Sequence, residues 1–342
     1  MEPAVRIGLD IAKSVFQVHG VSASGEVVVR QRLRRSNVLQ FFAKLPPCLV
    51  GLEACGAAHY WGRELRKFGH NVRLMPPGYV KAYLKGQKND AADAEAICEA
   101  VSRPTMRFVG IKNPEQQSVM ALHRVRLTLM RQRTQMSNSI RGHMAEYGLV
   151  AAVGRNGLAR LIAIVKDGDD ERIPTLARNC LAMLVMQWEM LNDQILETDR
   201  RVREDARSTE AGRHLMEIPG VGPVLASAMI AAVPDPFVFK SGRDLAAWIG
   251  LVPKQNSSGG KDRLGSITKR GNGYLRQLLV VGAIAVVRYA ERHGTRRPWL
   301  LHLLARRKAK VAAVALANKT ARMIWALMTS GERYREPLPA AA

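Results

Sequence analysis

Two short apolar runs in the first sixty residues each end in an acidic residue. Residues 7–9 lead into Asp10, and residues 49–52 lead into Glu53. A carboxylate that interrupts an apolar strand is costly to bury unless something cationic neutralises it. Acids on two strands of one sheet meet when both lie at the same end of that sheet. The pattern therefore predicts an α/β fold in which acidic side chains gather at one sheet edge.

A third acidic element follows the loop of residues 86–89. Asp90 is predicted to cap an Ala-rich helix, and Asp93 lies one turn further on, so both carboxylates leave the same face of the helix start. Taken alone, the pair is explained by the preference of helix N-termini for negative charge. Together with Asp10 and Glu53, however, it supplies oxygen ligands for magnesium or manganese. Such a set favours metal-dependent phosphoryl transfer.

The order of the predicted elements indicates a particular α/β architecture for residues 1–110. Residues 5–33 alternate as three strands of a β-meander. A helix near 37–44, the strand ending in Glu53, a helix near 59–68 and a strand at 72–75 follow. Three antiparallel strands succeeded by alternating strands and helices are typical of an RNase H-like α/β domain. The helix that carries Asp90 and Asp93 would be its last.

The net charge of +23 and the pI near 10.5 point to a polyanionic partner. The charge is uneven: +7 over residues 1–110, +2 over 111–205 and +14 over 206–342. An anionic membrane is the competing explanation, but the longest wholly apolar run, residues 278–287, stops at Arg288 and is too short to span a bilayer. We therefore expect nucleic acid to contact mainly the last third of the chain.

The cysteine pattern predicts a cytoplasmic protein. Cys48, Cys55, Cys98 and Cys180 show neither the CxxC spacing of zinc sites nor the density of a disulfide framework, so we expect reduced core thiols. The first residues run directly into a strand and leave no room for a signal peptide.

Residues 111–205 predict a long helical hairpin. The first arm has no acidic residue between 116 and 145 but carries several arginines, including Arg124 and Arg131, which favours contact with phosphates. The second arm has a coiled-coil spacing of apolar residues with one polar position, namely Leu181, Leu184, Trp188, Leu191, Ile195, Thr198 and Val202. An arm packed only on itself and an arm that joins two subunits both fit this pattern.

Residues 206–335 predict a mostly α-helical domain, followed by a tail at 336–342. Residues 218–222 resemble a helix-hairpin-helix turn, in which Gly220 and Gly222 would expose backbone N–H groups to a phosphate. A plain tight turn between helices is the alternative. Residues 251–273 form a glycine-rich loop in which four basic side chains would surround a phosphodiester: Lys261, Arg263, Lys269 and Arg270.

Two adjacent serines, Ser257 and Ser258, lie in this loop. They are either inert members of a phosphate-binding loop or a source of a nucleophilic hydroxyl. The loop contains no histidine to activate them. An activating group would have to come from elsewhere in the fold or from another subunit.

With these motifs in view, the chain resembles over nearly its whole length the DEDD transposases of bacterial insertion sequences, also called Piv-like recombinases. The resemblance is to insertion-sequence family one-ten and, within it, the eleven-eleven group. The matching segments are residues 8–13, 51–53, 88–94, 218–222, 250–261 and 267–271.

The resemblance implies a RuvC-like first domain in which Asp10, Glu53, Asp90 and Asp93 bind magnesium. It implies further that a serine becomes covalently linked to DNA. Its pattern places that serine at Ser258, with Ser257 as the second choice. It also implies a structured non-coding bridge RNA that pairs with donor and target DNA. A tetramer is implied too, in which the acids of one subunit complete the serine site of another.

Two other functions fit the same residues. A junction-resolving nuclease would cut DNA with metal-activated water, and its serines would only bind phosphate. A non-catalytic nucleic-acid-binding protein would carry the acids without using them. The first alternative predicts free DNA ends, and the second predicts that Asp10→Asn changes no activity.

Overall fold

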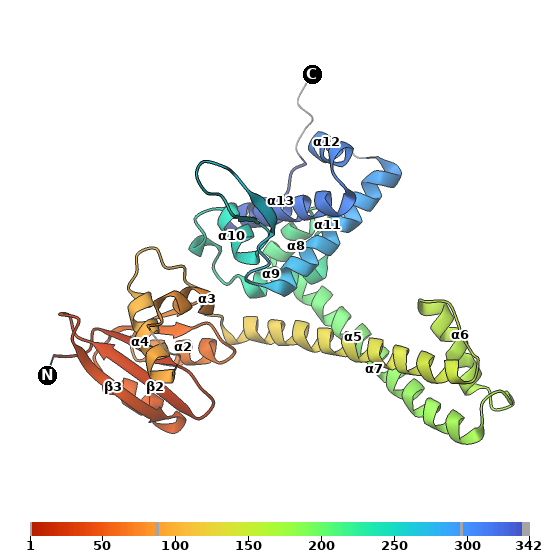
Figure 1. Cartoon of the computed structure of the whole chain (residues 1–342), viewed down its shortest axis with the longest axis horizontal. Helices are drawn as coiled ribbons and strands as arrows, with labels where there is room; N and C mark the ends of the chain where they lie inside the picture. The colour runs from red at the N-terminus through yellow and green to blue at the C-terminus, as the bar shows by residue number, and fades with distance from the viewer. Residues whose placement is uncertain (1, 86–88, 295–296, 337–342) are drawn as a thin grey trace. The chain divides into compact units, whose positions relative to one another are not determined.

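The computed structural model describes residues 2–85, 89–294 and 297–336 (Figure 1). The chain divides into two compact units. The first contains the residues up to 117 together with 232–240, and the second contains 118–231 and the residues from 241 onward. Loop residues 86–88 and the tail from 337 lie outside the described residues. The separate boundaries at 110 and 205 stay a prediction.

The first unit is built on a five-stranded sheet with the order β3-β2-β1-β4-β5. Strands β1, β2 and β3 pair antiparallel, whereas β1, β4 and β5 pair parallel. The strands are β1 (Arg6–Asp10), β2 (Val15–Val21), β3 (Val27–Arg34), β4 (Leu49–Glu53) and β5 (Asn71–Met75). The β-meander and the RuvC-like α/β topology predicted from the sequence are confirmed.

Helices cover both faces of this sheet. Alternate residues of a strand point to opposite faces, so neighbouring residues of β1 contact different helices. Ile7 and Leu9 of β1 are fully buried and share a core with α1 (Val38–Ala43) and α2 (Ala58–Lys67). Gly8, between them, faces α4 (Asp90–Val101), which packs across β1, β2 and β4 (Figure 1). The remaining short helices of this unit are α3 (Pro77–Val80), η1 (Arg35–Asn37), η2 (Lys81–Tyr83) and η3 (Pro236–Val238).

Two glycines in register let α4 approach the sheet closely. Gly8 pairs with Gly51 on the neighbouring strand. A Cβ atom at position 8 would lie 2.1 Å from the carbonyl oxygen of Ala94 and 2.4 Å from the backbone nitrogen of Cys98. At position 51 a Cβ would lie 2.8 Å from the Val101 side chain. The absence of side chains at these positions therefore sets the height of α4 above the sheet.

We expect Gly8→Ala to destabilise the first unit by about 1–3 kcal/mol, the usual cost of overpacking a core. The obstacle is helix backbone, which cannot rotate away as a flexible side chain can. Urea denaturation of the full chain, followed by circular dichroism, measures the effect. Gly78→Ala is the matched control, since no atom lies within 4 Å of a Cβ at that helical position. Equal stability of the two variants would contradict this account of α4.

The second unit begins with three helices, α5 (Pro114–Glu146), α6 (Arg155–Lys166) and α7 (Thr175–Ser208). The predicted hairpin has only two arms, so the presence of α6 corrects that prediction. Its apolar residues Leu158, Leu161 and Val165 pack with residues of α5 and α7 in one core. Their spacing of three and four residues is the mark of an amphipathic helix, a signal that the hairpin interpretation overlooked.

Contacts between α5 and α7 are partly polar. Arg126 forms an ion pair with Asp199, and the indole Nε1 of Trp188 donates to the Ser137 hydroxyl at 2.9 Å. Five of the seven predicted seam residues are buried, whereas Leu184 and Trp188 are half-buried. A coiled coil is not confirmed, because salt-bridged and hydrogen-bonded pairs interrupt the apolar contacts that such a seam requires.

The remaining part of the second unit is a group of helices with one small hairpin. Its elements are α8 (Glu210–Met216), α9 (Pro223–Ala232), α10 (Gly242–Ile249), β6 (Pro253–Gln255), β7 (Leu264–Ile267), α11 (Gly273–His293), α12 (Pro298–Arg306) and α13 (Ala309–Ser330). The predicted C-terminal helical region is confirmed, and it ends in the three helices α11, α12 and α13. The first break follows Gly294, whose φ of 75° ends α11.

Two of these helices, α11 and α13, are long and apolar enough to cross a membrane by length and composition alone. They pack on one another, and the buried residues of α11, such as Leu279 and Ala283, recur every three or four positions. Core helices of globular domains have the same composition, so this is weak evidence for a membrane.

The four cysteines are free thiols, but only Cys48 and Cys98 belong to the core. The prediction of four core thiols is wrong for Cys55 and Cys180, which are exposed. Cys55 lies in the turn after β4, and Cys180 lies on a solvent-facing side of α7. Burial raises the pKa of Cys48 to about 11, which keeps this thiol protonated and unreactive.

Candidate active site and nucleic-acid contacts

Asp10 is held at the end of β1 on the face of the sheet that α4 covers. It lies two residues after Gly8, and residues two apart on a strand point to the same face. The helix runs opposite to β1, since Cys98 lies near Arg6 and Ala94 lies near Gly8. Continuing this alignment brings the start of α4 to Asp10.

The start of α4 is capped by Asn89, whose side chain accepts a hydrogen bond from the backbone N–H of Ala92 at 2.9 Å. The prediction that Asp90 is the N-cap is therefore wrong by one residue. Asn89 has extended backbone angles, whereas Asp90 is the first residue of the helix. With Asn89 as the cap, Asp90 and Asp93 both project from the first helical turn, as expected.

Three of the four predicted acids come together. Asp10, Asp90 and Asp93 each offer a carboxylate oxygen, and these atoms all lie within 4.8 Å of one another. Asp10 and Asp93 are half-buried and Asp90 is exposed. We call these three residues the acid cluster. It joins residues eighty positions apart along the chain at one sheet edge.

Glu53 is not among the residues whose carboxylate oxygens all lie within 4.8 Å of one another. It ends β4, whose pairing with β1 matches Leu52 to Leu9, so Glu53 stands beside Asp10 on the neighbouring strand. It also lies two residues after Gly51, on the face that α4 covers. Glu53 thus borders the cluster from the next strand.

The donor set of the acid cluster suits a hard divalent cation. Three carboxylates supply only oxygen atoms, which magnesium and manganese prefer over nitrogen or sulfur. Carboxylates this close to one another repel unless positive charge lies between them. The arrangement is therefore consistent with a metal site.

Ser257 and Ser258 lie at the exposed tip of the hairpin formed by β6 and β7. The strands pair antiparallel, and a bridge joins Ser258 to Lys261 across Gly259 and Gly260. Both glycines have positive φ values, 55° and 75°, which the tight turn requires. Residues 251–273 are predicted as a loop, but the structure shows that they contain this β-hairpin.

The structure distinguishes the two serines. The Ser257 hydroxyl donates to Asp262 at 3.2 Å and accepts the backbone N–H of Arg263 at 3.1 Å, so it braces the turn. The Ser258 hydroxyl makes no hydrogen bond to any part of the chain that the structure describes. Ser258 thus has the hydroxyl that is available to a ligand.

The four basic residues predicted around this loop are exposed, but they belong to two regions. Lys261 and Arg263 lie at the tip with the serines. Lys269 and Arg270 lie at the base, where the backbone N–H of Lys269 donates to the carbonyl of Gly250 at 3.2 Å. An exposed, basic hairpin tip is a reasonable place for a phosphate ligand to bind.

The basic helix α5 uses several of its arginines internally. Arg126 pairs with Asp199, Arg133 donates to Asn192 at 3.2 Å, and Arg141 donates to three carbonyl groups near residue 152. Arg124 and Arg131, the two predicted to contact nucleic acid, are exposed. Fewer arginines of α5 are therefore available to phosphates than the lack of acidic residues in this segment suggests.

The glycines of the predicted helix-hairpin-helix turn differ in environment. Gly220 has a φ of 88°, and a Cβ there would lie 2.9 Å from the Val286 side chain and 3.0 Å from the carbonyl oxygen of Gly282, so this glycine permits packing on α11. Gly222 is exposed with no atom within 4 Å of a Cβ. Of the two, Gly222 is the accessible one.

A buried polar group on α5 was missed by the sequence reasoning. His123 lies among arginines in the sequence of α5, but its side chain is fully buried between Tyr274 and Ser227, each 2.9 Å from a ring nitrogen. Burial lowers its pKa to about 4, so the ring is neutral at pH 7. His123 therefore tethers α5 to α9 and α11. The sequence signal of this burial is the set of half-buried apolar residues three and four positions away, which share its helical face, namely Val119, Met120 and Leu127.

An RNase H-like sheet with an acid cluster at the end of its first strand is a feature of several classes of nucleic-acid-processing enzymes. A family model described as a transposase, of the DEDD type of IS110, matches residues 7–149. A second model, described as the transposase IS116/IS110/IS902 family, matches residues 212–297.

Relatives match nearly the whole chain. A probable family 20 transposase of Pseudomonas aeruginosa is 49% identical over 96% of this chain and 98% of its own length. Transposases for the insertion sequence elements IS1111A of Coxiella burnetii and IS1328 of Yersinia enterocolitica are 39% and 37% identical, over 96% and 95% of this chain and 91% and 97% of their own lengths.

This chain belongs to the IS110 family of insertion-sequence transposases. It is an enzyme that acts on DNA. Members of the DEDD class typically use a divalent metal ion, with which the acid cluster is consistent.

Proposed function

We propose that this transposase is an RNA-guided DNA recombinase that cuts and exchanges strands through a covalent phosphoserine intermediate. The observation that carries the proposal is the convergence of Asp10, Asp90 and Asp93 within 4.8 Å. A bound magnesium or manganese ion would be held by these three carboxylates, with Glu53 at their border. It would supply positive charge near the scissile phosphate.

In this proposal the Ser258 hydroxyl forms the bond to phosphorus, and the bond from phosphorus to one bridging sugar oxygen breaks. That sugar oxygen leaves with a proton, and the energy of the broken ester is kept in the serine ester. Strand exchange is the reverse reaction, in which a sugar hydroxyl of another strand attacks the phosphoserine and releases Ser258. A carboxylate of the acid cluster accepts the hydroxyl proton, since the hairpin tip has no histidine, and passes this proton to the departing sugar oxygen.

Two features support Ser258 as the nucleophile. Its hydroxyl is exposed and unbound within the described chain, whereas that of Ser257 braces the turn. Lys261 and Arg263 at the same tip would offset charge on the phosphate oxygens. The acids and the serine belong to different compact units, so we propose a tetramer in which the acids of one subunit serve the serine of another.

A structured bridge RNA is proposed to choose the donor and target sites by base pairing. The charge of +14 in the last third of the chain and the exposed Arg124 and Arg131 support binding of nucleic acid. Within this proposal the protein contacts backbone and shape, and pairing supplies the sequence choice. We propose that it acts in the cytoplasm, on the nucleoid.

Whether the protein binds a guide RNA can be tested by expressing its gene with the native flanking DNA and purifying the protein. We expect one discrete RNA to co-purify, to map to a flank, and to elute with a tetramer in size-exclusion chromatography with light scattering. Expression of the same coding region without flanks is the control and is expected to yield no discrete RNA. Specific recombination by RNA-free protein would contradict guidance by RNA.

The competing function is a nuclease that cuts junctions with activated water. The acid cluster alone suits that chemistry equally well. The free hydroxyl of Ser258 beside a braced Ser257 favours the covalent route. The two functions differ in whether protein stays attached to the cut DNA.

A further inference from the structure

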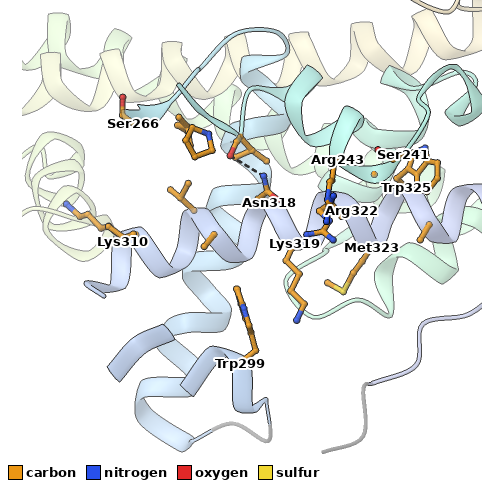
Figure 2. Close-up of a pocket in the computed structure, with 18 of the residues that line it drawn as sticks. Ser241, Arg243, Ser266, Trp299, Lys310, Asn318, Lys319, Arg322, Met323 and Trp325 are labelled. Atoms are coloured by element: carbon orange, nitrogen blue, oxygen red, sulfur yellow. Dashed lines mark hydrogen bonds between the residues drawn. The ribbon is translucent and has the colours of Figure 1, made fainter. Parts of the chain in front are cut away.

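A broad groove lies in the second unit, away from the hairpin tip. Its floor is α13, with small and apolar side chains such as Val314, Ala315 and Ala326. One wall is the β6–β7 hairpin, through Pro253 and Ile267. Its volume of about 1400 Å³ exceeds the roughly 300–1,000 Å³ of small-molecule sites, so the groove suits a polymer (Figure 2).

The charge of the groove is of one sign. Arg243, Lys310, Lys319 and Arg322 line it, and none of its lining residues is acidic. Arg243, Lys310 and Arg322 are exposed, and within the described ranges they form no ion pair. Figure 2 shows Lys310, Lys319 and Arg322 spread along the length of α13. Cations in such a row match a backbone of repeated negative charge.

Two tryptophans add flat apolar surface to the groove. Trp299 of α12 is 38% exposed, and the ammonium of Lys319 lies 4.5 Å from the centre of its ring. Trp325 lies on α13 itself, towards the end of the helix opposite to Lys310 (Figure 2). Aromatic rings beside cations are the usual elements of single-strand sites, where bases stack on the rings and phosphates meet the cations.

We propose that this groove binds an unpaired segment of nucleic acid, with bases on Trp299 and the apolar floor and with phosphates at Arg243, Lys310 and Arg322. A duplex would reach the cations but not the floor, because its bases are already stacked inside. Since the hairpin that carries Ser258 forms one wall, the unpaired segment would lie against the same hairpin. The proposal concerns binding only and does not depend on the chemistry proposed for the acid cluster.

Fluorescence anisotropy of the full-length protein in EDTA tests the groove. The probes are oligothymidylate, oligouridylate of equal length, and a mixed-sequence duplex, each labelled with fluorescein. We expect Trp299→Ala to weaken single-strand binding on the order of ten-fold, the effect of one lost base stack, and to change duplex binding less than about two-fold. Trp299→Phe should restore much of the affinity. Tighter binding of oligouridylate would assign the groove to RNA, and tighter binding of oligothymidylate to a DNA strand.

The salt dependence of binding tests the cations. Replacing Arg243, Lys310 and Arg322 together by glutamine should reduce the slope of log K against log salt for single strands by about 2, at roughly 0.7 for each lost phosphate contact. The control replaces Arg155, Arg160 and Arg207, three exposed arginines outside the groove, and should retain the slope.

Two results would overturn the proposal. One is unchanged single-strand affinity in a folded Trp299→Ala variant, as judged by circular dichroism. The other is an equal loss for duplex and single strand together with a changed oligomeric state in light scattering, which would mark the groove as a contact between copies of this chain.

Discussion

Ser258→Ala is expected to abolish the covalent protein–DNA adduct, with strand transfer reduced on the order of 10³-fold or more. The reason is chemical, since alanine has no oxygen to form the bond to phosphorus. The variant should fold normally, because the Ser258 hydroxyl supports no hydrogen bond within the described chain. The measurement is a denaturing gel of labelled element-end DNA incubated with protein, divalent metal and guide RNA.

Ser257→Ala is the matched control for this experiment. It removes a hydroxyl one residue away and loosens the turn through its bonds to Asp262 and Arg263, so we expect a reduced yield of adduct but not its loss. Adducts that persist in Ser258→Ala and vanish in Ser257→Ala would move the nucleophile by one residue. Cut DNA with free ends in both variants would favour the nuclease.

Asp10→Asn is expected to reduce cleavage by at least about 10²-fold while DNA binding is retained. Asparagine keeps the shape of the side chain but removes the negative charge that a divalent cation requires. Gel-based cleavage measures the chemical effect. Titration calorimetry with manganese should show that the ion binds the parent protein and binds the variant more weakly.

Glu99→Gln is the control for the acid cluster. Glu99 is also on α4, but it pairs with Arg103 at the far end of the helix. Loss of such a surface pair costs little, so cleavage and manganese binding should stay near those of the parent protein. If Asp10→Asn leaves both unchanged too, the acids do not act in catalysis and the chain only binds nucleic acid.

Local sequence patterns were sufficient for the first unit because its strands and helices are short and strongly patterned. The alternation around Ile7 and Leu9 predicts a strand with Asp10 at its end, and the structure agrees. Patterns were weaker at boundaries. Asn89 and Asp90 are both good capping residues, and only backbone angles show that Asn89 has the role.

Long helices were harder to predict in detail. A two-armed hairpin is predicted for residues 111–205, yet this segment also contains α6, whose apolar face packs with α5 and α7. His123 read as a basic-helix residue, yet it is buried against Tyr274 and Ser227. In both cases the deciding partner lies far away along the chain.

The sequence by itself determined the residue types that chemistry needs, the strands and the helix that carry them, and the resemblance that the relatives confirm. Only the tertiary structure decided which of those residues meet. Asp10, Asp90 and Asp93 come together because Gly8 and Gly51 let α4 pack close to β1, while Glu53 stays one strand away. Residue spacing specifies local geometry, but proximity between distant segments depends on how closely their backbones pack.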